Sequence, residues 1–251
     1  MKPKVNLSKE KIRARGIYLL PNALTTAALF SGFYAIVAAM KGLYSVAAIA
    51  IFAAMIADGL DGRVARLTNT QTLFGAEYDS LSDMVAFAVA PSLAIYSWSL
   101  SHLGKVGWLV AFIYTAATAL RLARFNTQLQ DDDKGYFQGL PSPSAAAVIA
   151  CMVWLGDSMA IPSEWAAIPT AIVTFIVAAL MVSRVRYYSF KKLDFHGKVP
   201  FIVAVLLVLI IAAVAMDPAR VLSIIFVGYV FSGPIITLSQ KRKMRKRRER
   251  V

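Results

Sequence analysis

The sequence has few of the residues that build disulfide frameworks or zinc sites. Its 251 residues include one cysteine, Cys151, and two histidines, His102 and His196. A single cysteine excludes an intramolecular disulfide framework. Neither histidine has another histidine or cysteine at a metal-binding spacing. We therefore expect both histidines to be bystanders and not metal ligands.

The chain also lacks a long polar stretch. It is 58% hydrophobic, with a mean hydropathy of +0.61, whereas an ordinary soluble domain is roughly 45 to 50% apolar. Its longest polar connections, near 124–142 and 184–198, leave no room for a soluble domain. The first apolar run is long and ends without a small-residue cleavage pattern, so we interpret it as a retained span. These features indicate a lipid-embedded chain.

Eight apolar stretches approach the roughly 20 residues that a helix needs to cross a bilayer. They lie near 17–40, 43–61, 76–100, 106–123, 143–161, 165–183, 199–216 and 219–238. We predict an all-α, polytopic helical membrane protein with about eight transmembrane helices, although six spans and two interfacial helices would have the same parity. The expected parts are a basic segment at 1–16, a transmembrane domain at 17–238 and a basic tail at 239–251.

Acidic residues are outnumbered, with 14 Asp and Glu against 27 Lys and Arg, for a formal net charge of +13. If the N-terminus is inside, the cytoplasmic segments hold 24 of these 27 basic residues, and only Lys41, Lys105 and Arg220 lie elsewhere. Because cytoplasmic loops carry an excess of Lys and Arg, we predict a protein of the cytoplasmic (inner) membrane with both termini inside. The basic termini should attract anionic membrane lipids, and no nucleic acid is expected as a partner.

Four aspartates lie where the second span ends and the third begins: Asp58, Asp61, Asp79 and Asp83. An ionised aspartate near hydrocarbon is costly, so it normally faces a polar cavity, a cation or a partner. At about 100° per residue, the first two share one helical face and the last two share another. Two such faces, meeting at the cytoplasmic boundary, could bind Mg²⁺ or Mn²⁺, which favour carboxylates and phosphates.

Small residues and one arginine accompany these aspartates. Gly62 and Gly75 would let a nucleotide or a neighbouring helix approach the backbone closely, and Ala65 keeps that wall thin. Arg66 carries a planar fork that can hold a pair of phosphate oxygens, which suggests a diphosphate substrate. A structural ion-pair cluster with Arg63 and Arg66 is the alternative, although four acids exceed two bases.

The pattern D-x₂-D-G-x₂-A-R-x₈-G-x₃-D-x₃-D, matched at every fixed position over 58–83, resembles the signature of the CDP-alcohol phosphatidyltransferases. The resemblance implies that family's helical membrane fold, a homodimer, and two Mg²⁺ or Mn²⁺ ions as cofactors. It implies that Asp58, Asp61 and Asp79 bind metal and also frame the CDP group. It implies that Asp83 binds metal and acts as the general base. The other positions implied to bind CDP are Gly62, Ala65, Arg66 and Gly75.

Beyond this signature, the sequence resembles the phosphatidylserine synthases of bacteria and archaea within the family. The segments that carry this resemblance are 21–22, 79–83 with Phe87 and 90–91, 119–126 and 139–146. It implies CDP-diacylglycerol and L-serine as substrates, and phosphatidylserine and CMP as products. Arg121 and Arg124, at i and i+3 of one helix, are candidates to bind a serine carboxylate or a lipid phosphate. Asn126 is a further candidate for this acceptor site.

Other functions stay open at this point. Glycerol 3-phosphate, inositol or inositol phosphate could be the acceptor, because Arg121 and Arg124 could also bind a phosphorylated alcohol. A cation-coupled membrane transporter could use the four aspartates as its ion site. Such transporters typically show repeated halves, whereas the acidic motif occurs once here. A catalytically silent scaffold could lose an aspartate, but all four are present.

Overall fold

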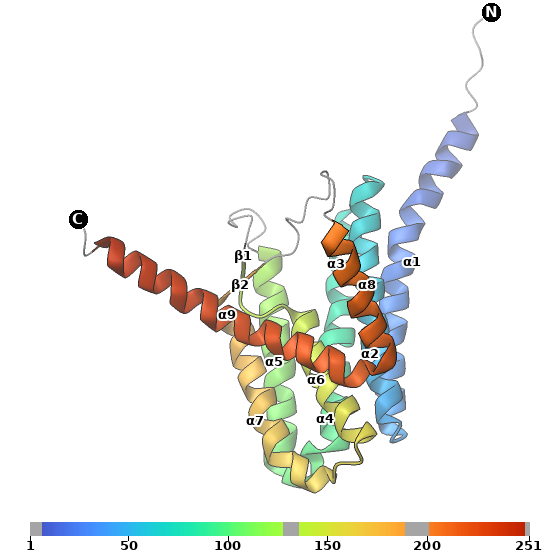
Figure 1. Cartoon of the computed structure of the whole chain (residues 1–251). Coiled ribbons are helices and arrows are strands. Elements are labelled where there is room, and N and C mark those ends of the chain that lie inside the picture. Colours follow the sequence, from blue (N-terminus) through green and yellow to red (C-terminus); the bar gives the residue numbers. More distant parts are fainter. Residues whose placement is uncertain (1–6, 128–135, 189–200, 249–251) are drawn as a thin grey trace, which may run out of the picture.

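The computed structural model describes residues 7–127, 136–188 and 201–248. Within these ranges the chain is helical apart from one two-stranded antiparallel ribbon (Figure 1). In chain order the elements are α1 (Leu7–Met40), α2 (Tyr44–Leu67), α3 (Leu73–Asp83), the π-helical η1 (Met84–Val89), α4 (Ala90–Trp98), the 3₁₀-helical η2 (Leu100–Leu103), α5 (Lys105–Thr127), β1 (Tyr136–Gln138), α6 (Ser142–Ser158), α7 (Ser163–Val182), β2 (Arg186–Tyr188), α8 (Phe201–Met216) and α9 (Pro218–Arg248).

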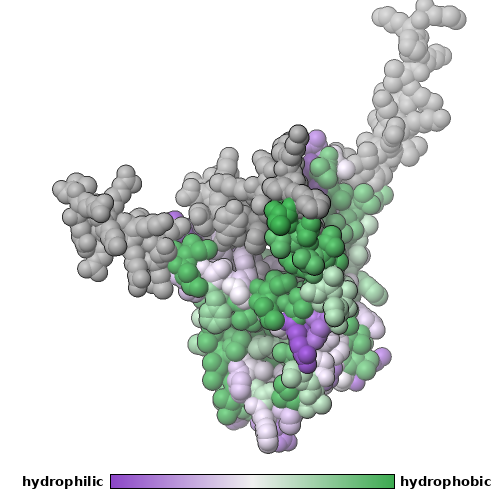
Figure 2. Space-filling model, viewed as in Figure 1, coloured by the Kyte–Doolittle hydropathy of each residue, from purple (hydrophilic) through white to green (hydrophobic). Residues whose placement is uncertain are grey.

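The predicted all-α membrane class is confirmed. Among the described residues, 6 helices are long and apolar enough to cross a membrane. Helices also occupy the other two predicted positions, but α6 and α8 have 17 and 16 residues, fewer than the roughly 20 of a full span. The count of eight complete spans therefore stays a prediction. Hydrophobic residues cover much of the sides of the bundle in Figure 2, as expected for a surface in contact with lipid.

The helices from α1 to α7 run up and down, so their connections alternate between the two ends of the bundle (Figure 1). The turn from α2 to α3 lies at the end where α1 begins, whereas the turns after α1, α4 and α6 lie at the opposite end. α6 is buried along most of its length at the centre. α9 crosses the bundle obliquely and packs against α6 and β2.

Small side chains let these helices approach one another closely. A Cβ atom on Gly32 of α1 would lie 2.7 Å from the Ala86 Cα of η1, so the two backbones are in direct contact there. Close packing of this kind is what holds helices together where lipid tails are as apolar as the side chains. The contact between Gly32 and Ala86 also fixes the position of α1 along the bundle axis relative to α3.

The turn between α2 and α3 is set by local hydrogen bonds. Asn69 adopts a left-handed φ of 52° after the last turn of α2. The Thr70 N–H donates to the Ala65 carbonyl at 3.0 Å and the Asn69 N–H to the Arg66 carbonyl at 3.3 Å, which is the Schellman pattern of a helix end. The Thr72 hydroxyl then accepts from the backbone of the first turn of α3. The chain therefore reverses direction tightly between the two pairs of aspartates.

The third predicted span, 76–100, is one helical rod interrupted by the π-helical turn η1. Its widened turn is seen in the Ala90 N–H, which donates to the Val85 carbonyl five residues earlier. Pro91 follows and has no N–H to offer to the Phe87 carbonyl. The buried Tyr114 hydroxyl of α5 donates to that carbonyl instead, at 2.9 Å. Pro91 and Tyr114 thus account for the π turn directly after Asp83.

Two boundaries differ from those expected from the sequence. α1 already begins at Leu7, within the segment predicted to be a basic extension. α9 continues to Arg248 without a break at 238, so the described part of the basic tail is an extension of a helix. Lys and Arg are good helix formers, which favours this continuation. Residues 1–6 and 249–251 of the predicted terminal segments lie outside the described residues.

Candidate active site

The four aspartates predicted from the sequence spacing come together between α2 and α3. One carboxylate oxygen from each of Asp58, Asp61 and Asp79 lies within 4.8 Å of the others. Asp61 is buried, and the other two are half-buried. The tight turn between the two helices makes this possible, because it directs the acidic face of α2 toward that of α3.

Asp83 completes the cluster one turn further along α3. Its carboxyl group lies beside that of Asp58, and it interacts electrostatically with Asp79 and with Arg121 of α5. A helix places residues i and i+4 on one side, so Asp79 and Asp83 project into the same space. Asp83 is therefore the aspartate that links the acidic cluster to Arg121.

The donor set of this cluster fits a hard divalent cation. Mg²⁺ holds oxygen ligands at about 2.0 to 2.1 Å, so two ligands on one ion are at most about 4.2 Å apart. Oxygens within 4.8 Å of one another need only small side-chain rotations to reach that separation. A bound cation would also offset the mutual repulsion of the carboxylates, which are packed together with little solvent.

A residue of α1 that the sequence analysis did not identify holds Asp61 in place. The buried Thr25 hydroxyl donates to Asp61 Oδ2 at 2.7 Å and also lies 3.1 Å from the Pro21 carbonyl. The Ser82 hydroxyl of α3 donates to the Thr25 carbonyl at 3.1 Å. Through Thr25, α1 is hydrogen-bonded both to α2 at Asp61 and to α3 at Ser82. The only sequence signal near Thr25 is the segment 21–22, which carries part of the family resemblance.

The small residues of the motif have different surroundings. No atom lies within 4 Å of the position that a Gly62 Cβ would take, so this face of α2 is open. A Gly75 Cβ would lie 3.1 Å from the Thr72 hydroxyl and 3.6 Å from the Asn22 amide oxygen of α1. Gly75 therefore has a packing role in addition to any contact with a ligand. Ala65 is half-buried, and Arg66 is exposed with its Nε donating to the Gly62 carbonyl at 2.9 Å.

The three candidate acceptor residues have different hydrogen-bond partners. Arg121 Nη1 donates to the Ser142 hydroxyl of α6 at 2.8 Å, and its Nε is buried with no hydrogen-bond partner among the described residues. Arg124 instead bonds to the Gln138 side chain of β1. The Asn126 amide donates to the Ser80 hydroxyl of α3 at 2.9 Å. Arg121 is thus the candidate that joins the aspartate cluster, while the other two tie α5 to its neighbours.

A second contribution missed in the sequence comes from the C-terminal helix. Tyr229 of α9 lies close to Arg121. Its ring lies 5.6 Å from that of Tyr187 in β2, and the Tyr187 hydroxyl donates to the Val230 carbonyl at 3.2 Å. Gly233 leaves room for the Tyr187 ring, which a Cβ would approach to 2.4 Å. The ribbon therefore positions α9 beside the arginine.

Comparison with known proteins identifies the family. The model of the CDP-alcohol phosphatidyltransferase family matches residues 18–177. This match spans most of the chain and contains all four aspartates. The chain belongs to the CDP-alcohol phosphatidyltransferase family. The family model ends within α7, so α8, α9 and Tyr229 lie beyond the matched residues.

Curated relatives within this family share one printed name, CDP-diacylglycerol–serine O-phosphatidyltransferase. The Helicobacter pylori protein is 37% identical over 221 residues, covering 87% of this chain and 91% of the relative. The Mycobacterium tuberculosis protein is 34% identical over 242 residues, covering 91% and 82%. The Bacillus subtilis protein is 34% identical over 173 residues, covering 69% and 92%.

Membership of the CDP-alcohol phosphatidyltransferases confirms the resemblance inferred from the aspartate spacing. It also gives the acidic cluster a context, because this is a family of enzymes that use a divalent metal. The carboxylates of α2 and α3, with Arg121 beside Asp83, bring a metal-binding donor set and a cationic group together.

Proposed function

We propose that this protein is a phosphatidylserine synthase, which transfers the phosphatidyl group of CDP-diacylglycerol to the hydroxyl of L-serine and releases CMP. The observation that carries the proposal is the half-buried Arg121 beside Asp83, whose Nε is buried and has no hydrogen-bond partner among the described residues. Asp83 would be the base and Arg121 the anion-binding group, and an amino acid acceptor requires both at one place. The name shared by the H. pylori, M. tuberculosis and B. subtilis relatives supports the same acceptor.

In this proposal the aspartates hold the diphosphate end of CDP-diacylglycerol. Asp58, Asp61, Asp79 and Asp83 are the residues that would bind two Mg²⁺ or Mn²⁺ ions, and the first three also frame the CDP group. When bound, the ions neutralise phosphate charge on the substrate and on the leaving CMP. The remaining CDP contacts are assigned to Gly62, Ala65, Arg66 and Gly75. The open face at Gly62 is consistent with a close approach of the nucleotide.

The transfer step needs a base next to the acceptor hydroxyl. The serine oxygen forms a bond to the phosphorus that carries the lipid, and the bond from that phosphorus to the CMP oxygen breaks. CMP leaves with the bonding electron pair, and the serine hydroxyl proton passes to the Asp83 carboxylate. A carboxylate is a weak base, so we expect proton transfer to occur late, when the new bond already acidifies the hydroxyl.

Arg121 would orient serine for this step. Its Nε is a buried donor that has no partner within the described ranges, and such a group normally has a partner. A carboxylate fits the planar fork of a guanidinium. A phosphorylated acceptor carries more charge, and Arg124, the other candidate, is engaged with Gln138. This difference favours serine over glycerol 3-phosphate or inositol phosphate. Asn126 is retained as an outer acceptor contact through its link to Ser80.

The experiment that tests this function measures CMP release by the purified full-length protein with CDP-diacylglycerol and Mg²⁺ or Mn²⁺. L-Serine, glycerol 3-phosphate, inositol and inositol phosphate are supplied in separate reactions, with a reaction lacking any acceptor as the background. We expect release above background with L-serine only, together with phosphatidylserine in the lipid extract. A rate that does not depend on serine would overturn the assignment of the acceptor.

We also infer an arrangement in the membrane. The domain at 17–238 would carry the reaction on the cytoplasmic side of the cytoplasmic membrane, and the basic segments 1–16 and 239–251 would lie against anionic lipids there. The distribution of 24 of 27 basic residues supports this orientation. A homodimer is proposed from family resemblance. Cysteine labelling of connections at both ends of the bundle tests the orientation, and light scattering in detergent tests the dimer.

A further inference from the structure

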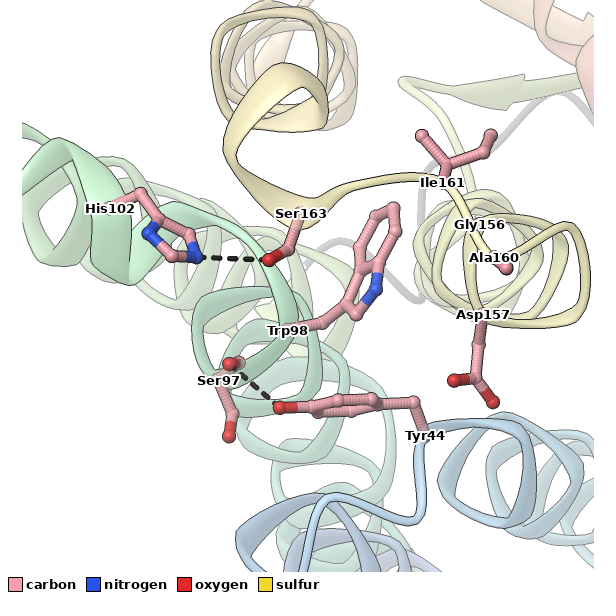
Figure 3. A pocket seen from close by; sticks show the side chains of 9 residues that line it. All are labelled: Tyr44, Ser97, Trp98, His102, Gly156, Asp157, Ala160, Ile161 and Ser163. Atoms are coloured by element: carbon pink, nitrogen blue, oxygen red, sulfur yellow. Dashed lines mark hydrogen bonds between the residues drawn. The ribbon is translucent and has the colours of Figure 1, made fainter.

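A cavity lies at the end of the bundle opposite the aspartates, where α2, α4, α6 and α7 begin or end (Figure 3). Its volume is about 310 Å³, which matches the lower end of small-ligand pockets at roughly 300 to 1,000 Å³. The walls carry polar groups from different helices, among them Tyr44, Asp157 and His102. None of them takes part in the proposed phosphatidyl transfer.

Trp98 forms the inner wall of this cavity and carries a donor that has no partner. Its side chain is only 6% exposed, and no acceptor for its Nε1–H is found in the part of the chain that the structure describes. Figure 3 shows the indole nitrogen on the side of the ring that faces Asp157 and Tyr44. An indole N–H at the wall of a cavity is a donor for a bound ligand. The cavity therefore suits a ligand with an acceptor oxygen.

Asp157 supplies the negative charge of the cavity. Its Oδ2 accepts from the Ser45 N–H at 3.0 Å and also from the Ser45 hydroxyl at the start of α2. Its Oδ1 has no partner in the described ranges, and Asp157 is the only acid among the lining residues. A carboxylate next to the rings of Trp98 and Tyr44 is a setting that favours an organic cation. One ammonium group would therefore balance the negative charge of Asp157.

Gly156 keeps the indole in this place. A Cβ on Gly156 would lie 2.1 Å from two carbons of the Trp98 ring, so the ring packs directly on the backbone of α6. On the opposite rim, the His102 ring is hydrogen-bonded to the Ser163 hydroxyl at 3.0 Å, and the Tyr44 hydroxyl donates to the Ser97 carbonyl at 3.0 Å. These contacts hold the cavity open by packing and hydrogen bonds across four helices.

An apolar crevice adjoins the cavity and shares Trp98, Gly156 and Ile161 with it. It also measures about 310 Å³ and runs between α6 and α7, past Leu155 and Pro169. Trp165 at its edge is 80% exposed, so the crevice opens on the surface that faces lipid. A polar cavity and an apolar crevice on the two sides of one indole match a head group and an acyl chain.

We propose that this cavity and crevice bind a phospholipid with a primary ammonium head group, at the membrane boundary opposite the aspartate cluster. The ammonium donates to Asp157, a phosphate or ester oxygen accepts from Trp98 Nε1–H, and the start of one acyl chain fills the crevice between α6 and α7. A primary ammonium fits better than a trimethylammonium group, because only the former can donate to the free carboxylate oxygen.

The test is isothermal titration of the full-length protein in detergent with dihexanoyl phosphatidylethanolamine. Asp157→Asn retains an acceptor for the Ser45 N–H but removes the charge, and we expect it to weaken binding about tenfold or more. Trp98→Phe removes the indole N–H together with part of the ring, and should weaken binding about two- to tenfold. Glu164→Gln is the matched control, because Glu164 is an exposed acid at the same end that does not line the cavity. It should bind as the wild type does, as should Asp79→Asn.

Two further probes separate a lipid from other ligands. Dihexanoyl phosphatidylglycerol has no ammonium group, and glycerophosphoethanolamine has the head group without acyl chains. We expect both to bind at least about tenfold more weakly than the ethanolamine lipid. Equal binding of phosphatidylglycerol would overturn the ammonium assignment, and equal binding of glycerophosphoethanolamine would overturn the lipid assignment. Wild-type affinity in folded Asp157→Asn and Trp98→Phe would exclude the cavity itself.

Discussion

Replacement of Thr25 by valine tests whether α1 is part of the metal site. Thr25 is buried, at 4% exposure, and its hydroxyl donates to Asp61 Oδ2 at 2.7 Å. Valine has the same branched shape but no donor, so the packing of α1 against α2 should persist. Asp61 is equally buried, at 4% exposure, and water has little access to replace the lost hydrogen bond. The carboxylate should then lose its fixed orientation.

The expected size follows from the type of hydrogen bond that is lost. A hydrogen bond to a charged group contributes about 1.5 to 3 kcal/mol, and removal of a group that orients a metal ligand typically costs about 10- to 100-fold in metal affinity. We therefore expect the Kd for Mn²⁺ of Thr25→Val to rise about 10- to 100-fold, which is roughly 1.4 to 2.8 kcal/mol. Electron paramagnetic resonance of free Mn²⁺ measures this Kd without catalysis. CMP release should recover at saturating metal.

Thr26→Val is the matched control for this experiment. Thr26 is the next residue of α1, but its hydroxyl is exposed and bonds to the Asn22 carbonyl at 2.7 Å and to the Tyr78 hydroxyl at 2.9 Å. It does not contact an aspartate, so its Kd for Mn²⁺ should equal that of the wild type. An unchanged Kd in Thr25→Val would refute the role of α1. A loss of activity that added metal fails to restore would refute the metal-based explanation.

Four further substitutions test the roles proposed for the site and for the π turn beside it. Asp83→Asn should retain CDP binding in titrations better than turnover, whereas Asp58→Asn should weaken both, and full turnover by Asp83→Asn would exclude it as the base. Arg121→Lys keeps the charge but loses the fork, so the KM for serine should rise about tenfold or more with a smaller change in kcat, and a pure kcat effect would contradict serine binding. Tyr114→Phe leaves a buried carbonyl without its donor and should lower the free energy of unfolding by about 1 to 3 kcal/mol. Thermal unfolding checks this against the exposed Tyr34→Phe, and equal stability would contradict it.

The acidic core of the site could be predicted because it depends on helix geometry alone. Asp58 and Asp61 are three residues apart and Asp79 and Asp83 four, and both spacings place side chains on one helical face. The tight turn that joins the two faces is also encoded locally, by Asn69 after α2. These features need no knowledge of how distant helices pack, so the sequence was sufficient to place the four carboxylates at one membrane boundary.

Contacts between distant helices could not be predicted in the same way. Thr25 is 36 residues from Asp61. The two residues meet only because the close contact between Gly32 and Ala86 fixes where α1 lies along its neighbours, and no local sequence pattern indicates that contact. The two arginines of α5 were equally good candidates, since residues i and i+3 are about 60° apart around a helix. The hydrogen bond to Ser142 of α6 holds Arg121 on the side of α5 that faces Asp83.

The π-helical turn η1 connects the site to the rest of the fold. A π turn adds one residue to a helical turn and is frequent at functional sites. Because it follows Asp83 directly, it changes the facing of every later residue of the span by about 100° relative to an unbroken α-helix. α3 can therefore direct Asp79 and Asp83 toward α2, while α4 directs a separate face, including Ala94 and Ile95, into the buried core. The two requirements conflict in a regular helix, and the wide turn allows one span to meet both.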